Sequence, residues 1–277
     1  MKHKFKNRTR ENEGATGGDL TSGPVMRTML CFAIPMILGN ILQQFYNVAD
    51  TLIVGRFLGS DALAAVGSSF TLMTFLTSIL LGLCMGSGAV FSIRFGQKDD
   101  KRLKEGICAS FVLVASITVV LNILAFAGID GIIFFLQVPE EILPIAVQYL
   151  RIVFAGLIFT FFYNFLAATM RALGDSKSAL YFLMISSVLN IGGDLFFVEV
   201  LGWGSEGCAL STVLSEALCC VLCVVYIQFK VPVLQLGRRW FVFDGSLLRS
   251  TVQYGWTSAM QQATVQLGKI AVQAIVN

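Results

Sequence analysis

The chain has 277 residues, of which 56% are hydrophobic and only 13% are charged, and its net charge is +3. A soluble globular domain has about 25% charged residues, so this chain has too few charges to cover a water-facing surface. The composition excludes an ordinary soluble domain and indicates an integral membrane protein, which we expect to contact membrane lipid and no nucleic acid.

The first predicted element is a polar, basic tail over residues 1–27, which we expect to be disordered. Apolar runs of about 20 residues, the length that crosses a bilayer, then recur along the chain. A lipid-exposed segment must satisfy its own backbone hydrogen bonds, so we predict that each run is a helix. The predicted spans are roughly 28–54, 66–93, 107–129, 143–169, 178–200, 207–229 and 252–276. The predicted fold is therefore all-α, a polytopic membrane helix bundle.

The spans divide into one complete lobe and the start of another. Residues 28–229 would form a lobe of six transmembrane helices, and the polar stretch 230–251 would be a cytoplasmic connection. Residues 252–277 would be the first helix of a truncated second lobe, because the sequence stops at Asn277 inside a span, as a fragment would. Glycines such as Gly82, Gly86 and Gly88 are interpreted as positions of close helix packing.

Lysine and arginine predict the orientation, because cytoplasmic connections of membrane proteins are enriched in both residues. Of the 20 basic residues, 17 lie in the tail or on alternate connections, whereas the other connections carry mainly acids. We therefore expect a multi-pass protein of the cell membrane with a cytoplasmic N-terminus.

The seven cysteines fall in or beside apolar runs. Cys219, Cys220 and Cys223 are close in sequence, but no second Cys-x-x-Cys pair is present and the one histidine, His3, lies in the tail. We interpret the cysteines as small packing residues, with no zinc site and no disulfide framework.

Asp50 lies in an otherwise apolar part of the first span, and it belongs to a polar stripe on that helix. The members recur at steps of three and four residues: Asn40, Gln43, Gln44, Asn47, Asp50 and Thr51. Such a stripe should face protein or a water-filled cavity.

Other spans contribute further polar residues. The fifth carries Asn190 and Asp194, which share a helix face at i and i+4. The fourth carries Tyr163 and Asn164, and the sixth carries Ser211, Thr212, Ser215 and Glu216. At about 1.5 Å per helical residue, Asp50 and Asp194 both reach the outer half of the bilayer, so contact between them is possible.

Two acids in a membrane predict a particular chemistry. A carboxylate in a span costs about 2.5–3.5 kcal/mol on insertion scales. Burial favours its neutral form, and a second carboxylate nearby strengthens that preference. Such a group can take up a proton and release it when water or a cation arrives, as an ion-coupled transporter requires. Asn190, Asn164, Tyr46 and Thr212 would supply neutral oxygens and donors around it.

Several alternatives stay open. Either acid could be structural, paired with Lys269 or hydrogen-bonded between helices, and Glu216 could have only a packing role; Lys269 itself could snorkel or face a cavity. Intramembrane aspartyl proteolysis also needs two membrane aspartates, but its Tyr-Asp and Gly-x-Gly-Asp patterns match poorly. A signalling or purely structural membrane protein is a further alternative. No Gly-x-x-x-x-Gly-Lys-[Ser/Thr] loop is visible, which argues against ATP-driven pumping by this chain.

The sequence resembles the multidrug and toxic compound extrusion (MATE) family over nearly all of its apolar part. The matching segments are IPMILGNILQQFYNVADTLIVGRFLGSDALAAVG (34–67), RALGDSK (171–177), LNIGGDLFF (189–197) and GCALSTVLSE (207–216). The resemblance implies a non-enzymatic antiporter of twelve helices in two lobes. It would export drugs or cationic and amphiphilic small molecules in exchange for protons or sodium, without a cofactor.

The resemblance also implies roles for individual residues. Asp50, Asn190 and Asp194 match the ion and substrate site, where sodium is possible, Tyr46, Asn164 and Thr212 match its supporting residues, and Pro35 matches a helix-bending proline. Glu216 departs from the family by adding a third acid. The missing second lobe would be required for function. A sister family that flips lipid-linked sugars is the alternative, while the cargo, the choice of ion and the oligomeric state stay open.

Overall fold

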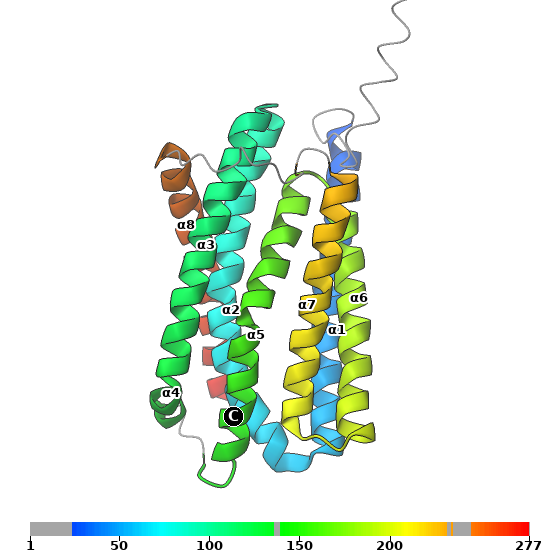
Figure 1. The fold of residues 1–277 in the computed structure, drawn as a ribbon, viewed down its shortest axis with the longest axis vertical. Helices are drawn as coiled ribbons and strands as arrows, with labels where there is room; N and C mark the ends of the chain where they lie inside the picture. The colour runs from blue at the N-terminus through cyan, green and yellow to red at the C-terminus, as the bar shows by residue number, and fades with distance from the viewer. Residues whose placement is uncertain (1–23, 136–138, 232–233, 235–244, 277) are drawn as a thin grey trace, which may run out of the picture.

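The computed structural model describes residues 24–135, 139–231, 234 and 245–276, and every regular element in this part is helical. The helices stand side by side with roughly parallel axes (Figure 1). In chain order they are α1 (Val25–Phe57), α2 (Gly59–Gly96), α3 (Asp100–Ala127), α4 (Ile129–Phe135), α5 (Leu143–Ala172), α6 (Ser176–Leu195), the π-helical turn η1 (Phe196–Val200), α7 (Ser205–Lys230) and α8 (Gly245–Val276). The all-α membrane bundle predicted from the sequence is confirmed.

Six helices of the described part are long and apolar enough to cross a membrane, and they correspond to the first six predicted spans. The seventh predicted span, 252–276, lies within α8, which is not one of the six. Its glutamines, among them Gln253, Gln261 and Gln262, make this helix more polar than the others. The expected tail falls on residues 1–23, which lie outside the described part, and on the first residues of α1.

Several boundaries differ from the prediction, and α2 and α3 each begin seven residues before the predicted spans, at Gly59 and Asp100. The third span ends at Ala127 and is followed by the separate short helix α4. The fifth ends as the π-helical turn η1, and such turns depend on local hydrogen-bond geometry that hydropathy does not report. Helix α8 begins at Gly245, seven residues before the predicted 252, because its first two turns are polar and invisible to an apolar-run criterion.

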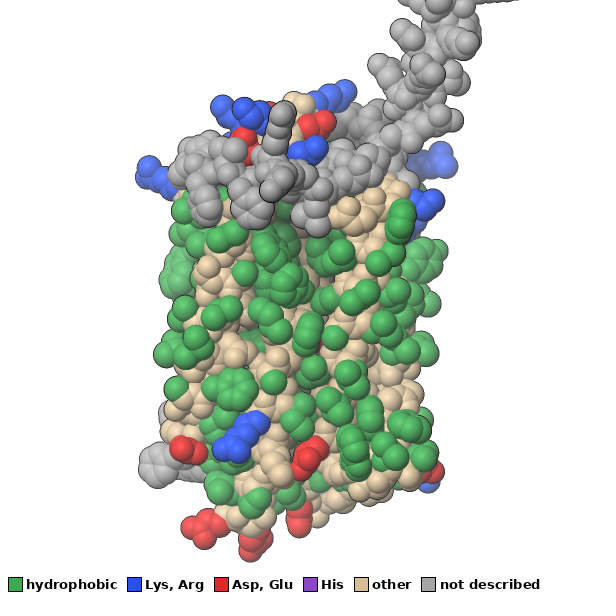
Figure 2. Space-filling view, in the orientation of Figure 1, with side chains coloured by type: hydrophobic (Ala, Val, Ile, Leu, Met, Phe, Trp, Pro, Cys, Tyr) green, Lys and Arg blue, Asp and Glu red, His purple; other side chains and the backbone are tan. Residues whose placement is uncertain are grey.

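The charges are distributed between the two ends of the bundle. Most lysines and arginines that are visible in Figure 2 lie at the end where α1 begins, and most acids lie at the opposite end, with a band of apolar side chains between them. Exposed side chains of this band include Val120, Ile123 and Leu124 on α3. A bilayer would cover this band, which explains why so many large apolar residues face outward.

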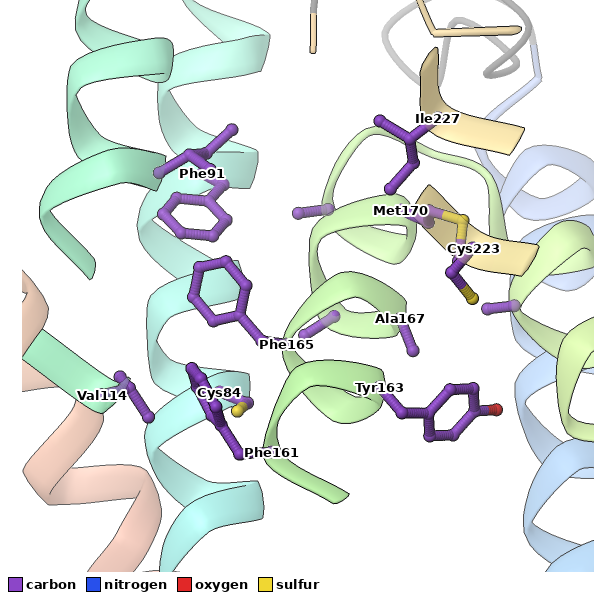
Figure 3. Packing of buried hydrophobic residues seen from close by; sticks show 14 of the residues in the cluster. Cys84, Phe91, Val114, Phe161, Tyr163, Phe165, Ala167, Met170, Cys223 and Ile227 are labelled. Carbon is purple, nitrogen blue, oxygen red and sulfur yellow. The ribbon is translucent and has the colours of Figure 1, made fainter. Parts of the chain in front are cut away.

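Helix α5 lies between two groups of helices, with α2, α3 and α8 on one side and α1, α6 and α7 on the other (Figure 1). On the first side, Phe161 and Phe165 of α5 pack with Phe111 of α3 and Phe91 of α2 in an aromatic core. Tyr163 points away from this core, toward the second group (Figure 3). The polar face of α5 is thereby directed at α1, α6 and α7.

Two glycines of α2 bring α8 close. A Cβ atom at Gly82 would collide with the backbone of Ala259, and one at Gly86 would collide with the backbone of Gly255. Gly88 faces Ala168 of α5 instead, at an ordinary contact distance. A buried hydrogen bond of 2.9 Å between the hydroxyls of Ser110 and Thr251 adds a polar link from α3 to α8. These small residues make the close approach of the two helices possible.

Candidate functional site

A cluster of polar side chains lies between α1, α6 and α7, near the end of the bundle that is distant from the start of α1. Asp50 comes from α1, Asn190 and Asp194 come from consecutive turns of α6, and α7 supplies Cys208. Helix α6 packs against both α1 and α7, which brings the three elements together. Asn190 is 1% exposed and Asp194 is fully buried, whereas Asp50 is partly exposed.

The two aspartates face each other. One carboxylate oxygen of Asp50, one of Asp194 and the Sγ atom of Cys208 lie within 4.8 Å of one another. Four buried oxygens of the cluster have no hydrogen-bond partner within the described protein: Asp50 Oδ1, Asn190 Oδ1, Asp194 Oδ1 and Asp194 Oδ2. An unpaired buried acceptor costs about 1–3 kcal/mol, and more when it is charged. The cluster therefore needs a proton or a cation to complete it.

Hydrogen bonds to α7 fix the orientation of Asn190. Its Nδ2 donates to Thr212 Oγ1 at 3.0 Å, and its backbone carbonyl accepts from Ser211 Oγ at 2.8 Å. Thr212 in turn donates to the backbone carbonyl of Cys208 at 3.1 Å. Because the NH₂ end of the amide is engaged, its oxygen is the end presented without a partner. Thr212 thus holds Asn190 as an acceptor for a positively charged or protonated group.

A small cavity of about 50 Å³ lies beside this cluster. It is lined by Gln43, Tyr46, Tyr163, Asn164, Leu183, Ser186, Ser187, Ser215 and Glu216. This volume holds a few water molecules, since each needs at least about 10–15 Å³ of such space. A drug-sized ligand needs about 300–1,000 Å³. In this arrangement the polar cavity therefore has room for a few water molecules but not for a drug-sized cargo.

Glu216 is the carboxylic acid among the described residues that line the cavity. Its Oε2 accepts a hydrogen bond of 2.5 Å from Thr160 Oγ1 on α5. Asn164, one turn further along α5, donates to the backbone carbonyl of Thr160 at 2.7 Å. Glu216 is therefore held by one partner and has capacity for further ones, an intermediate case between a satisfied and an unsatisfied acid.

The structure divides the seven predicted site residues into two adjacent groups. Asp50, Asp194, Asn190 and Thr212 form the buried cluster, whereas Tyr46, Asn164 and Glu216 line the cavity. Tyr46 lies near Thr212, and this proximity links the two groups.

Two further residues with predicted importance lie apart from the site. Pro35 is buried within α1, which continues through it without a break, and it belongs to neither group. Lys269 belongs to α8, but its side chain lies outside the described part, so its pairing with an aspartate stays untested.

Sequence reasoning missed two residues of the site. It interpreted Cys208 as a packing cysteine, yet its thiol lies beside both aspartates. Cys208 precedes Thr212 by four residues on α7, so its place on the same helix face was available as a signal. Thr160 was missed as well, and it precedes Asn164 by the same spacing.

Comparisons with known proteins show the family of the chain. The family model MatE matches residues 35–196. The probable multidrug resistance protein YpnP of Bacillus subtilis is 31% identical over 260 residues, which are 94% of this chain and 58% of that protein. The multidrug export protein MepA of Staphylococcus aureus is 26% identical over 222 residues, which are 78% of this chain and 48% of that protein.

Solved structures share the fold of this chain. A crystal structure of MATE in complex with MaL6 superposes with a TM-score of 0.88 at 25% identity, covering 94% of this chain and 58% of that one. A MOP superfamily transporter from Pyrococcus furiosus gives 0.86 at 26% identity, over 93% and 57% of the two chains. The chain thus spans roughly half to three fifths of the proteins that it resembles.

Proposed function

The chain belongs to the MatE family, and from this we propose that it forms the ion-binding lobe of a secondary exporter of cationic or amphiphilic small molecules, driven by protons or sodium. Proteins of the family are transporters and not enzymes, which removes intramembrane aspartyl proteolysis from the alternatives. No cofactor is part of the proposal beyond the coupling ion itself.

The single observation that carries the proposal is the pair of buried, unpartnered carboxyl groups at Asp50 and Asp194. Two carboxylates this close repel each other, and low polarity amplifies the repulsion. A proton shared by the pair removes the repulsion. Sodium would be accepted by the same oxygens together with Asn190 Oδ1, since hard cations prefer oxygen ligands. The pair can thus exist in an ion-loaded and an ion-free state that differ in charge.

The adjacent cavity is the proposed place for the positive charge of the cargo. Glu216 supplies a carboxylate there, and no lysine or arginine is among its described lining residues. The relatives are called multidrug resistance and multidrug export proteins, which supports a drug-like cargo. The Pyrococcus furiosus neighbour is described as having a binding pocket of reverse polarity that suggests a different function. The acid in this chain's cavity favours a cation exporter over a flippase of lipid-linked sugars.

Coupling between ion and cargo would follow from the contact between the two groups. When Asp50 and Asp194 are ion-free, their negative charge and that of Glu216 together attract a cation into the cavity. Loading the pair with a proton or sodium removes part of this attraction and favours release. Tyr46 and Thr212 would transmit the change, because Tyr46 borders the cavity and Thr212 orients Asn190.

The proposal includes an arrangement in the membrane. Residues 28–229 would be one lobe, with 230–251 as a connection and 252–277 as the start of a second lobe that is required for function. The protein would lie in the cell membrane with the basic end of the bundle on the cytoplasmic side, as the lysine and arginine bias predicts. Pro35 would provide a weak point in α1, because proline removes one helix hydrogen bond.

Dye efflux in everted vesicles under an imposed proton or sodium gradient tests this function. In the full-length protein, which carries both lobes, we expect that Asp50→Asn and Asp194→Asn each reduce gradient-driven efflux to the background level while the protein still inserts. Asp61→Asn is the matched control, since Asp61 is exposed at the start of α2. Normal gradient-driven efflux in both buried-acid variants would reject the proposal, and the effective gradient would identify the ion.

A further inference from the structure

We propose that Cys208, Asp50, Asp194 and Asn190 together form a binding site for a thiophilic divalent cation, of which Zn²⁺ and Cd²⁺ are the test cases. Binding itself is a property of these four side chains. Its consequence for transport, a block of the coupling centre, rests on the function proposed above.

The geometry places three ligand atoms in one group. The Sγ atom of Cys208 and one oxygen from each aspartate lie within 4.8 Å of one another. Ligand atoms around a tetrahedral zinc are somewhat closer than this, since Zn–S and Zn–O distances are about 2.3 and 2.0 Å. Small side-chain rotations toward a shared centre would close the difference. Asn190 Oδ1 supplies a fourth ligand atom, from the same helix face as Asp194.

A second observation, independent of this proximity, points to a ligand. Both oxygens of Asp194, the amide oxygen of Asn190 and one oxygen of Asp50 are buried without a hydrogen-bond partner in the described protein. Asp194 and Asn190 are at most 1% exposed. Buried polar atoms without partners are rare in native proteins, and an ion is one of the few groups that satisfies several at once.

The donor set selects the class of cation. Carboxylate and amide oxygens alone would suit sodium, magnesium or calcium, but a thiolate shifts the preference to zinc and similar soft ions. The metal would displace the proton of the Cys208 thiol and any proton held by the aspartates, so binding releases protons to water.

Cys208 differs from Cys219 and Cys220 of α7, whose thiols are engaged by backbone carbonyls. Cys219 Sγ donates to the carbonyl of Phe182 at 3.4 Å, and Cys220 Sγ donates to the carbonyl of Phe159 at 3.2 Å. Both thiols therefore serve packing between helices, as the sequence interpretation expected. Cys219→Ser is for this reason a matched control, with the same substitution on the same helix away from Asp50 and Asp194.

The test is Cd²⁺ binding to the purified full chain. Binding is measured by calorimetry and by the ultraviolet absorption of the cadmium–thiolate bond. We expect a saturable absorption band in the unchanged protein and in Cys219→Ser. Cys208→Ser should lose the band and weaken Cd²⁺ binding by at least about tenfold, because loss of even a supporting partner of a metal ligand costs about 10–100-fold. Mg²⁺ in excess should displace little Cd²⁺. An undiminished band and affinity in Cys208→Ser would overturn the proposal.

Asp194→Asn provides a second readout, which keeps the test decisive if Cys208→Ser folds poorly. This variant retains the thiol but loses a charged ligand, so Cd²⁺ binding should again weaken by at least about tenfold. Unchanged affinity there would also overturn the metal site. In vesicles, Cd²⁺ should inhibit efflux by the unchanged protein and by Cys219→Ser, and inhibit Cys208→Ser less, each relative to its own metal-free rate. Failure of the metal site would leave the effects of Asp50→Asn on gradient-driven efflux intact, so the two proposals fail separately.

Discussion

Helix α6 has an aspartate at each end, and the two are in opposite circumstances. Asp175 precedes the first turn, where its Oδ1 accepts from the backbone N–H of Ser178 at 3.0 Å and its Oδ2 accepts from the Tyr226 hydroxyl at 2.9 Å. Tyr226 also accepts from Ser178 Oγ at 2.7 Å. Asp194 lies in the last turn, with both oxygens buried and without a partner in the described protein.

We interpret the difference as one between a structural acid and the acid of the proposed ion site. Asp175 caps α6 and ties it to α7, so its interactions stabilise the bundle in one arrangement. The Asp194 carboxyl group makes no such stabilising hydrogen bonds, and its burial costs free energy unless a proton or an ion binds to it. A protein tolerates an uncompensated acid of this kind where it works as a site. Removal of the carboxylate at the two ends should therefore have opposite effects.

The largest effect is expected from Asp194→Asn. An amide removes the buried charge, so the thermal stability of the purified protein should be unchanged or raised by about 1 kcal/mol. Ion-coupled efflux should nevertheless fall to background. Melting curves and vesicle efflux on the same preparation measure both quantities. A variant that lost its fold would instead show that Asp194, like Asp175, has a structural role.

Asp175→Ala should show the reverse pattern. Loss of the helix cap costs about 0.5–2 kcal/mol, and loss of the Tyr226 hydrogen bond adds about 0.5–1.5 kcal/mol. The melting temperature should fall clearly, while the protein that remains folded should keep its preference for protons or sodium. A changed ion preference would contradict the division between the two ends.

Glu216→Gln tests the intermediate case, an acid with one partner. Thr160 can donate to the amide oxygen of glutamine as well as to a carboxylate, so we expect little loss of stability. Removing the negative charge should reduce efflux of a cationic dye several-fold, by weakening a screened ion pair of about 1 kcal/mol or more. Efflux of an uncharged amphiphile is the control and should change less. Equal loss for both cargoes would remove Glu216 from charge recognition.

Tyr226→Phe should have the smallest effect. It deletes one hydrogen bond to Asp175 and one from Ser178 but keeps the ring, which packs edge-on against Phe182. We expect a loss of about 0.5–1.5 kcal/mol in the free energy of unfolding and no change in ion coupling. Denaturant unfolding of Tyr226→Phe and Asp175→Ala, measured side by side, gives the two losses in the free energy of unfolding. A loss as large as that of Asp175→Ala would mean that the cap itself contributes nothing.

Much of the fold could be predicted because each apolar run is long enough to specify its own helix. The shared face of Asn190 and Asp194 was also predictable, since it follows from helix periodicity alone. The start of α8 at Gly245 was not, because a helix outside the apolar region leaves no hydropathy signal. The short helix α4 and the turn η1 depend on local backbone geometry in the same way.

The site was only partly predictable for a different reason. Periodicity gives the face on which Asp50 or Cys208 lies, but not the rotation of α1 and α7 about α6. The rotation of these helices places the Cys208 thiol beside the two aspartates. It also places Tyr46 and Glu216 at the adjacent cavity instead. It results from packing over the whole length of the helices, so no single segment of sequence reports it.

Infrared difference spectroscopy of protonated carboxyl groups tests the central claim most directly. On raising the pH or adding sodium to the purified protein, we predict the loss of a protonated-carboxyl signal. This signal should be strongly reduced in the double variant Asp50→Asn/Asp194→Asn and unchanged in Asp175→Asn. A signal of equal intensity in the double variant would show that the two buried aspartates do not exchange a proton or an ion, and it would contradict the account.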